Sequence, residues 1–146
     1  MPITVYTDGA TAPSNPGPSG WGAVLLEDGV VPSEHCGFIG HATNQIAELT
    51  AAIEGLSLTP MGAEVELVSD SQYVLKGLTE WRIGWVRRGF KTAQNEPVKN
   101  MDLWKKLYAV ADARKVTTRW VRGHNGDQFN ELADMLANKG RMSSKS

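Results

Sequence analysis

The length and composition of the chain are those of one globular domain. Of its 146 residues, 41% are hydrophobic and 21% are charged. These fractions lie near globular averages, which excludes collagen-like, coiled-coil and intrinsically disordered classes. We predict a single domain over residues 1–141 and a disordered tail over 142–146. The net charge of -1 argues mildly against a nucleic-acid partner, but the distribution of charge matters more than its sum.

The chain carries no sequence signal for export or membrane insertion. Met1 to Val5 is not followed by a long apolar run, so we expect a cytoplasmic protein without membrane contact. We also expect a monomer with no obligate protein partner. The single cysteine, Cys36, cannot form an internal disulfide and is predicted to be a small core or edge-strand residue.

Three strands are predicted at the start of the chain. Residues 3–7 alternate apolar and polar side chains and stop at Asp8-Gly9. A loop rich in Pro and Gly follows to Gly20, then strands over 21–26 and 30–39, the last interrupted by Pro32. The short connections between them favour an antiparallel meander.

A helical pattern then alternates with short strands. Apolar residues recur at helical spacing from Ile46 to Leu56 behind a Thr43-Asn44 cap. A buried strand over 65–68 and a helix over 72–78 complete a crossover that favours parallel pairing with the first strand.

The second half of the chain is predicted to add helices and one more strand. We expect a short helix over 81–85, a basic loop over 87–99, a helix over 101–111, a strand over 116–121 and a helix over 130–139 closed by Gly140. Trp104 and Trp120 fall in regular amphipathic patterns and are expected in the core. The predicted class is therefore α/β, a five-stranded mixed sheet of three antiparallel and two parallel strands flanked by helices.

Four acids fall at strand ends or in helices beside them, where functional residues gather in such sheets. They are Asp8, Glu48, Asp70 and Asp134. If the first and fourth strands are neighbours, Asp8 and Asp70 end side by side. Clustered carboxylates repel each other, and hard divalent cations such as Mg²⁺ supply the counter-charge. Each acid also has an ordinary interpretation: a turn residue for Asp8, a helix N-cap for Asp70, and solvated helix faces for the other two.

The surrounding motifs resemble those of type 1 ribonuclease H, in order and over most of the chain. The matching segments are Thr7-Asp8-Gly9, Asn15-Pro16-Gly17-Pro18, Thr43-Asn44-Gln45 with Ala47-Glu48-Leu49, Ser69-Asp70-Ser71-Gln72-Tyr73-Val74, and Gly123-His124 with Asn130-Glu131-Leu132-Ala133-Asp134. The resemblance implies a ribonuclease H-like fold and an endonuclease that hydrolyses the RNA strand of RNA/DNA hybrids, leaving 5′-phosphate and 3′-hydroxyl ends. It also implies that the four acids hold two Mg²⁺ ions, with Mn²⁺ as a substitute, and that His124 assists proton transfer or product release.

The resemblance further implies where the RNA/DNA hybrid binds. Asn15, Asn44 and Gln45 would lie in the minor groove, where a ribose 2′-hydroxyl distinguishes the two strands. Gln72 would lie near the RNA strand, and Thr43 would contribute to a pocket for a DNA phosphate. One extra residue before Asn15, and His41 where many relatives carry arginine, depart from the family pattern.

A local basic segment contrasts with the near-neutral whole. Arg87, Arg88 and Lys91 directly follow Trp81 and Trp85, which are four residues apart and share a helical face. Aromatic rings beside cations suit sugar stacking and phosphate contact, and in the family such a segment grips the DNA strand. Alternatively, both indoles pack the helix onto the domain.

Three other functions compete with hybrid cleavage. A hybrid-binding module that no longer cuts would lose a metal ligand, and all four acids are present. A nucleotide-dependent enzyme would use Gly17 to Gly22 as a phosphate loop, which Pro16, Pro18 and the strand that follows disfavour. Another nuclease or integrase of the same broad fold would lack Gly123-His124 and the basic segment.

Overall fold

Hydrogen bonding joins five strands into one mixed sheet in the order β3-β2-β1-β4-β5. The structure is a computed structural model and describes residues 3–28, 32–123 and 125–143. The strands are β1 (Ile3–Thr11), β2 (Gly17–Leu26), β3 (Ser33–Ala42), β4 (Glu64–Ser69) and β5 (Lys115–Trp120). The first three pair antiparallel, and β4 pairs parallel with both β1 and β5. The predicted fold class is confirmed, and Cys36 lies on the edge strand β3.

The first two strands are longer than predicted. Asp8 does not end β1, because the strand continues to Thr11 and pairs with β2 down to Ser19. The first residues of β2, Gly17 to Gly20, pair with β1 or β3 instead of forming a loop. Gly, Pro and Ser are typical of turns, so pairing with both neighbours overrides the local signal here. A phosphate loop at Gly17 to Gly22 is thereby excluded.

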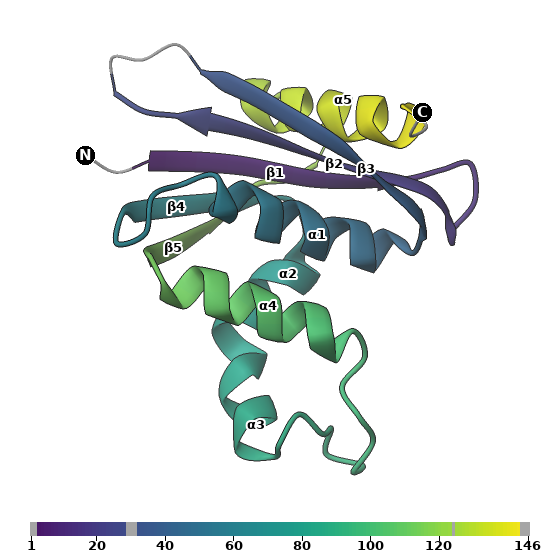
Figure 1. Cartoon of the computed structure of the whole chain (residues 1–146), viewed down its shortest axis with the longest axis vertical. Coiled ribbons are helices and arrows are strands. Elements are labelled where there is room, and N and C mark those ends of the chain that lie inside the picture. The colour runs from purple at the N-terminus through teal and green to yellow at the C-terminus, as the bar shows by residue number, and fades with distance from the viewer. Residues whose placement is uncertain (1–2, 29–31, 124, 144–146) are drawn as a thin grey trace.

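Helices cover both faces of the sheet (Figure 1). Helix α1 (Asn44–Ser57) lies on one face with α4 (Met101–Asp112) beyond it, and α5 (Gln128–Met142) lies on the other. Alternate residues of β1 point to opposite faces. Val5 belongs to the larger core with Leu49 and Trp104, whereas Tyr6 belongs to a second core with Leu136.

Helix α5 continues past the glycine that was predicted to close it. Gly140 is helical, and a Cβ there would lie 2.4 Å from the carbonyl oxygen of Gly37 in β3. This residue is therefore glycine because of close packing against the sheet rather than because of a helix end. Arg141 and Met142 are helical too, while residues 144–146 lie outside the described part of the chain.

The two short helices predicted after β4 form one continuous segment. It consists of α2 (Gln72–Lys76), a π-helical turn η1 (Gly77–Trp81) and α3 (Arg82–Arg87). The buried Trp104 ring fills the space beside Gly77, and the Tyr108 hydroxyl donates to the Gly77 carbonyl at 2.7 Å. These contacts hold the widened turn. α3 and the basic connection after it extend away from the sheet (Figure 1).

The two tryptophans predicted in the core have different surroundings. Trp104 is fully buried, as expected, but Trp120 is 45% exposed at the end of β5. β5 is an edge strand, and only its start reaches the larger core, through Val116, so Trp120 at its other end lies beyond that core. The Trp120 indole N–H instead donates to the Asp70 carbonyl at 3.2 Å.

Among the residues that the structure describes, no helix combines the length and the apolar character needed to cross a membrane.

We predict that Trp104→Ala lowers the free energy of unfolding by roughly 3–5 kcal/mol, because it leaves a cavity at the centre of the larger core. Trp120→Ala is the matched control and should cost less than about 1 kcal/mol, since that ring is largely exposed. Urea denaturation followed by circular dichroism measures both. Equal losses would contradict the different burial of the two rings.

Candidate active site

The four acids line one open cavity of about 350 Å³. Asp8 lies in β1, Glu48 in the second turn of α1, Asp70 directly after β4, and Asp134 in α5. The parallel register pairs Tyr6 with Val68, so Asp8 and Asp70 each lie two residues beyond that pair. Neighbouring strands thus bring two acids together that are distant in the sequence, as predicted.

Three of the acids are close enough to share a cation. Asp8, Glu48 and Asp70 each offer a carboxylate oxygen, and these atoms lie within 4.8 Å of one another. Asp134 approaches from the other face of the sheet and hydrogen-bonds the side chain of Asp8. The group contains only oxygen ligands, which suits a hard divalent cation.

A glycine allows α1 to approach β1 this closely. A Cβ at Gly9 would lie 2.4 Å from the backbone carbon of Ala47, the residue before Glu48. The Gly9 N–H donates to Asp8 Oδ1 and to Glu48 Oε1, both at 3.0 Å. One backbone donor therefore holds two carboxylates that would otherwise repel each other. The Asp-Gly pair is part of a strand, not the turn considered from the sequence.

The cluster changes the protonation of its members. Burial raises the pKa of Asp8 to about 11, with further contributions from Glu48 and Asp70 and from the hydrogen bond with Asp134. Burial also raises the pKa of Glu48 to about 8, assisted by Asp70 and opposed by the Gly9 hydrogen bond. In the absence of cations the cluster therefore retains protons to a higher pH than separate, exposed carboxyl groups would. A bound divalent cation would displace those protons.

The interpretation of Asp70 as a helix cap is wrong, because a neighbouring residue caps α2. The Ser71 hydroxyl accepts from the N–H of Val74, at 3.2 Å. Likewise Thr43, not Asn44, caps α1 by accepting from the N–H of Ile46 at 3.1 Å. Hydroxyl groups thus cap both helices, so neither Asp70 nor Asn44 is the capping residue.

The residues predicted to contact the minor groove lie at the start of α1. The Asn15 side-chain carbonyl accepts from the backbone N–H of Asn44 at 3.0 Å, so the structure brings these two exposed residues together. Thr43 is next to them, and Gln72 is exposed at the start of α2. The side-chain oxygen of Gln45 is buried without a hydrogen-bond partner among the described residues, so this side chain would have to turn outward to reach a groove.

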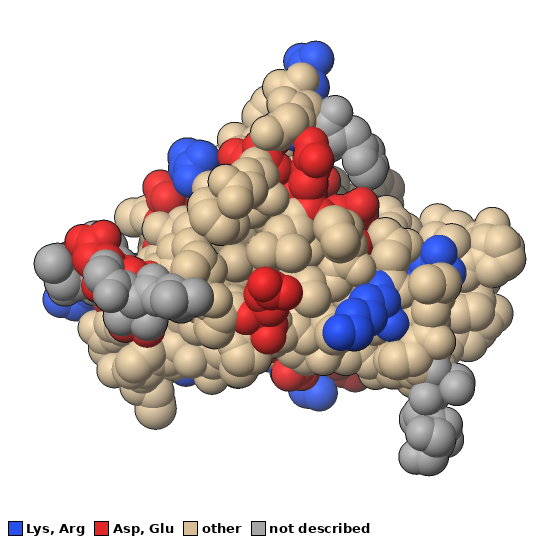
Figure 2. Space-filling model, turned by 90° about the horizontal axis from the view of Figure 1, so that it is seen from above, with Lys and Arg blue, Asp and Glu red and all other residues tan. Residues whose placement is uncertain are grey.

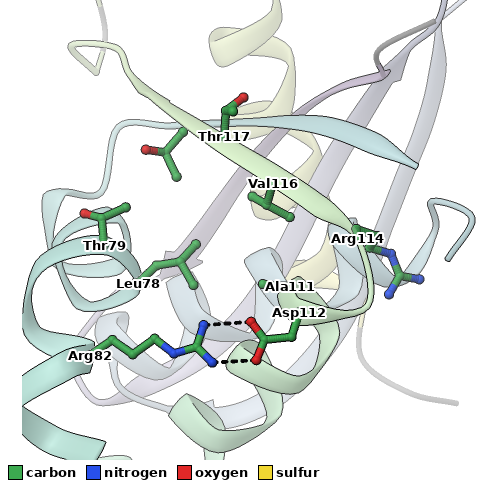
Figure 3. Close-up of a pocket in the computed structure, with 9 residues that line it drawn as sticks. Leu78, Thr79, Arg82, Ala111, Asp112, Arg114, Val116 and Thr117 are labelled. Atoms are coloured by element: carbon green, nitrogen blue, oxygen red, sulfur yellow. Dashed lines mark hydrogen bonds and ion pairs between the residues drawn. The ribbon is translucent and has the colours of Figure 1, made fainter. Parts of the chain in front are cut away.

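The basic segment lies apart from the acids. Arg87, Arg88 and Lys91 are exposed, and within the described part of the chain none of them pairs with a carboxylate. Arg82, by contrast, is held by two hydrogen bonds to Asp112 in a pocket between η1, α4 and β5 (Figure 3). The salt bridge removes Arg82 from the free basic surface.

Both tryptophans of this segment pack in an aromatic cluster. The Trp81 and Trp85 rings are 5.5 Å apart, and Trp85 lies 5.2 Å from Trp104. Trp81 also lies 6.0 Å from Tyr73 and is 36% exposed. Packing onto the domain, the alternative considered from the sequence, is therefore present for both indoles, and contact with substrate stays a prediction. His124 lies outside the described residues.

Sequence reasoning missed four residues that line the cavity: Gly9, Ala10, Thr11 and Asn138. Gly9 was taken only as a turn residue, and the close approach of Ala47 was not visible in the sequence. Asn138 lines the cavity too. Its position four residues after Asp134, on the same face of α5, was a signal that could have identified it.

Comparison with known proteins identifies the family. The sequence matches the RNase H family over residues 1–142. The chain belongs to the ribonuclease H family. It is 51% identical over 138 residues to Ribonuclease H of Pseudomonas putida (strain W619), covering 94% of this chain and 92% of that protein. It is 52% identical to Ribonuclease HI of Caulobacter vibrioides, covering 94% and 91%.

Solved structures agree with this assignment. LC9-RNase H1, described as a type 1 RNase H with the type 2 active-site motif, superposes with a TM-score of 0.83 at 26% identity, over 96% of this chain and 72% of that one. RNase H1 from Halobacterium salinarum NRC-1 gives 0.64 at 30% identity, over 96% and 97%. The predicted resemblance is confirmed. The chain is an enzyme, a ribonuclease H, and cleavage of RNA/DNA hybrids is its function.

We predict that Asp8→Asn stabilises the cation-free protein at pH 8. The pKa of Asp8 is higher in the folded protein than in the unfolded chain, where it is near 4, so this carboxyl group lowers the stability of the fold as the pH rises above 4. Asparagine cannot ionise and removes this loss. The gain should be about 2 kcal/mol, or a Tm increase of roughly 4–8 °C, and should vanish below about pH 3, where the carboxyl is protonated in both states.

Calorimetry at several pH values with EDTA measures this effect. Glu54→Gln, which removes an exposed carboxylate from α1, is the matched control and should change Tm little at any pH. A lower Tm for Asp8→Asn at pH 8 would show that the carboxylate stabilises the fold and is not strained by its neighbours.

Proposed function

We propose that Asp8, Glu48, Asp70 and Asp134 hold two Mg²⁺ ions, with Mn²⁺ as a substitute, at the site of RNA cleavage. The observation that carries this is the convergence of four acids on one cavity, three of them with oxygen atoms within 4.8 Å. The three clustered acids offer carboxylate oxygens as ligands, and burial opposes their charge. Such a group is stable as anions only with cations bound.

When bound, the two ions would polarise the scissile phosphate and activate the attacking water for in-line displacement, leaving 5′-phosphate and 3′-hydroxyl ends. The residues of the chain supply the arrangement. Gly9 fixes the angle between Asp8 and Glu48, and the sheet register fixes the distance from Asp8 to Asp70.

His124 is proposed to assist proton transfer or product release. Its neighbour Gly123 supports this, because a Cβ there would lie 2.7 Å from Asp70 Oδ2, so the chain passes directly beside the acids. An imidazole changes its charge near neutral pH, which suits a group that must both accept and release a proton.

Recognition of the hybrid is proposed at the start of α1 and α2. Asn15 and Asn44 are exposed, in contact with each other, and Asn44 lines the acidic cavity. Amide side chains both donate and accept hydrogen bonds, so they can recognise a ribose 2′-hydroxyl beside the cleaved phosphate. Gln45, Gln72 and Thr43 would extend this surface along the groove.

The exposed basic side chains at the end of α3 and directly after it are proposed to bind the DNA strand. Arg87, Arg88 and Lys91 are exposed, and they lie at the end of α3 and in the connection after it, a segment that extends away from the sheet (Figure 1). Trp81, which ends η1 just before α3, is 36% exposed and packs against Trp85. The end of the molecule over α5 and β3 shows basic and acidic side chains only as separate small groups (Figure 2).

A cytoplasmic, monomeric enzyme remains our prediction.

We predict that Asp70→Asn lowers the cleavage rate by on the order of a thousandfold, equivalent to about 4 kcal/mol of transition-state stabilisation, because it weakens cation binding. Hybrid affinity should change less than about threefold. A labelled duplex, offered as RNA/DNA, RNA/RNA or DNA/DNA with Mg²⁺ or EDTA, measures both rate and specificity. Glu54→Gln should cleave normally, and cleavage in EDTA would refute the metal role.

A second prediction concerns the basic segment. Arg87→Gln with Arg88→Gln should weaken hybrid binding. The double substitution should also reduce the slope of log Kd against log salt concentration by about 1 for each phosphate that loses its basic side chain. Adding Lys91→Gln should reduce the slope further. Lys115→Gln with Lys139→Gln removes the same charge as the arginine pair from exposed positions elsewhere. If the lysine pair reduced the slope as much as the arginine pair, the DNA strand would not bind specifically at the basic segment.

A further inference from the structure

Asp134 differs from the other acids in how its carboxylate is held. Asp8 and Glu48 both accept from the backbone N–H of Gly9. Asp134 lies inside α5, where the helix uses the backbone donors nearby. Only a side chain can fix its carboxylate from within the helix.

Asn138 and Arg141 supply that side-chain connection. The Asn138 amide nitrogen donates to the Asp134 backbone carbonyl at 3.0 Å and to Asp134 Oδ1 at 3.5 Å. The Arg141 Nε donates to Asn138 Oδ1 at 2.7 Å. The three residues follow one side of α5, and Asn138 itself lines the acidic cavity.

The chemistry of arginine decides which way the amide points. Arg141 can only donate, so the oxygen of Asn138 must face it and the NH₂ group must face Asp134. If Arg141 were absent, the amide could turn over and place its oxygen against the carboxylate, which would be repulsive. Arg141 therefore acts on Asp134 through Asn138, although it does not touch the carboxylate.

We propose that Asn138 and Arg141 are positioning residues for Asp134, which set its carboxylate for divalent cation binding. This inference rests on the proposed function, in which Asp134 is a cation ligand. The contact of Oδ1 with the Asn138 amide restricts the rotation of the Asp134 carboxylate, which lines the cavity. Ligands held by such outer hydrogen bonds bind metal more tightly because less freedom is lost on binding.

Isothermal calorimetry with Mn²⁺ on the full chain without nucleic acid tests this, independently of cleavage. Asn138→Leu, which removes the donor and keeps the branched shape, should raise the Kd for Mn²⁺ about tenfold, and Arg141→Gln about threefold. The double variant should match Asn138→Leu alone, because Arg141 acts only through Asn138. With Mg²⁺, kcat on the hybrid should fall while KM stays unchanged.

Lys139→Gln is the matched control for charge. Lys139 is an exposed cation in the same last turn of α5. Loss of a positive charge near a cation site should strengthen Mn²⁺ binding slightly, so weaker binding in Arg141→Gln cannot be a charge effect. An Arg141→Gln Kd no higher than that of Lys139→Gln, or additive effects in the double variant, would overturn the proposal.

A variant of Asp134 itself tests the metal site separately from the positioning role of Asn138 and Arg141. Asp134→Asn should weaken Mn²⁺ binding more than any of the other substitutions. If Asp134→Asn weakens Mn²⁺ binding and Asn138→Leu does not, the positioning role is wrong while the metal site stands. If Asp134→Asn has no effect on Mn²⁺ binding, the proposed ligand set is wrong. Should Asn138→Leu fold poorly by circular dichroism, the comparison of Arg141→Gln with Lys139→Gln still decides.

Discussion

Mutual repulsion among buried carboxylates is the constraint on which the rest of the structure depends. Asp8 is almost fully buried, and neighbouring acids and burial raise its pKa and that of Glu48. Holding such groups together costs several kcal/mol unless protons or cations offset the charge. The elements that carry them must therefore be fixed by interactions far from the site, which is the role of the two cores on either face of the sheet.

The acids are fixed at three different levels of structure. Backbone pairing of β1 with β4 sets Asp8 beside Asp70, close packing at Gly9 sets Glu48, and helix α5 brings Asp134 from the opposite face. Strand register and backbone packing tolerate little movement. The backbone of α5 is held in the same way, because a Cβ at Gly22 in β2 would lie 2.5 Å from the carbonyl oxygen of Ala133, the residue before Asp134. Only the orientation of the Asp134 carboxylate is left to side-chain contacts.

The sequence predicted what periodicity and motif order encode. Apolar alternation and helical spacing identified the sheet and its parallel crossover, and they placed Asp8 beside Asp70, although β1 continues past Asp8. It could not show features that depend on tertiary pairing. The extension of β1 beyond Asp8 requires β2, the exposure of Trp120 follows from the edge position of β5, and Gly140 is glycine because β3 lies against it. None of these neighbours is visible in the local sequence.

The aromatic cluster fixes where the basic segment lies relative to the acids. Trp85 packs on the buried Trp104, whose ring occupies the space beside Gly77, so the base of the basic segment is joined to the larger core. The same core contains Val5, three residues before Asp8 on β1. The separation between the exposed cations and the acids is therefore set by apolar packing and not by charge. Because salt screens electrostatic attraction but not packing, added salt would leave the distance between these basic side chains and the acids unchanged.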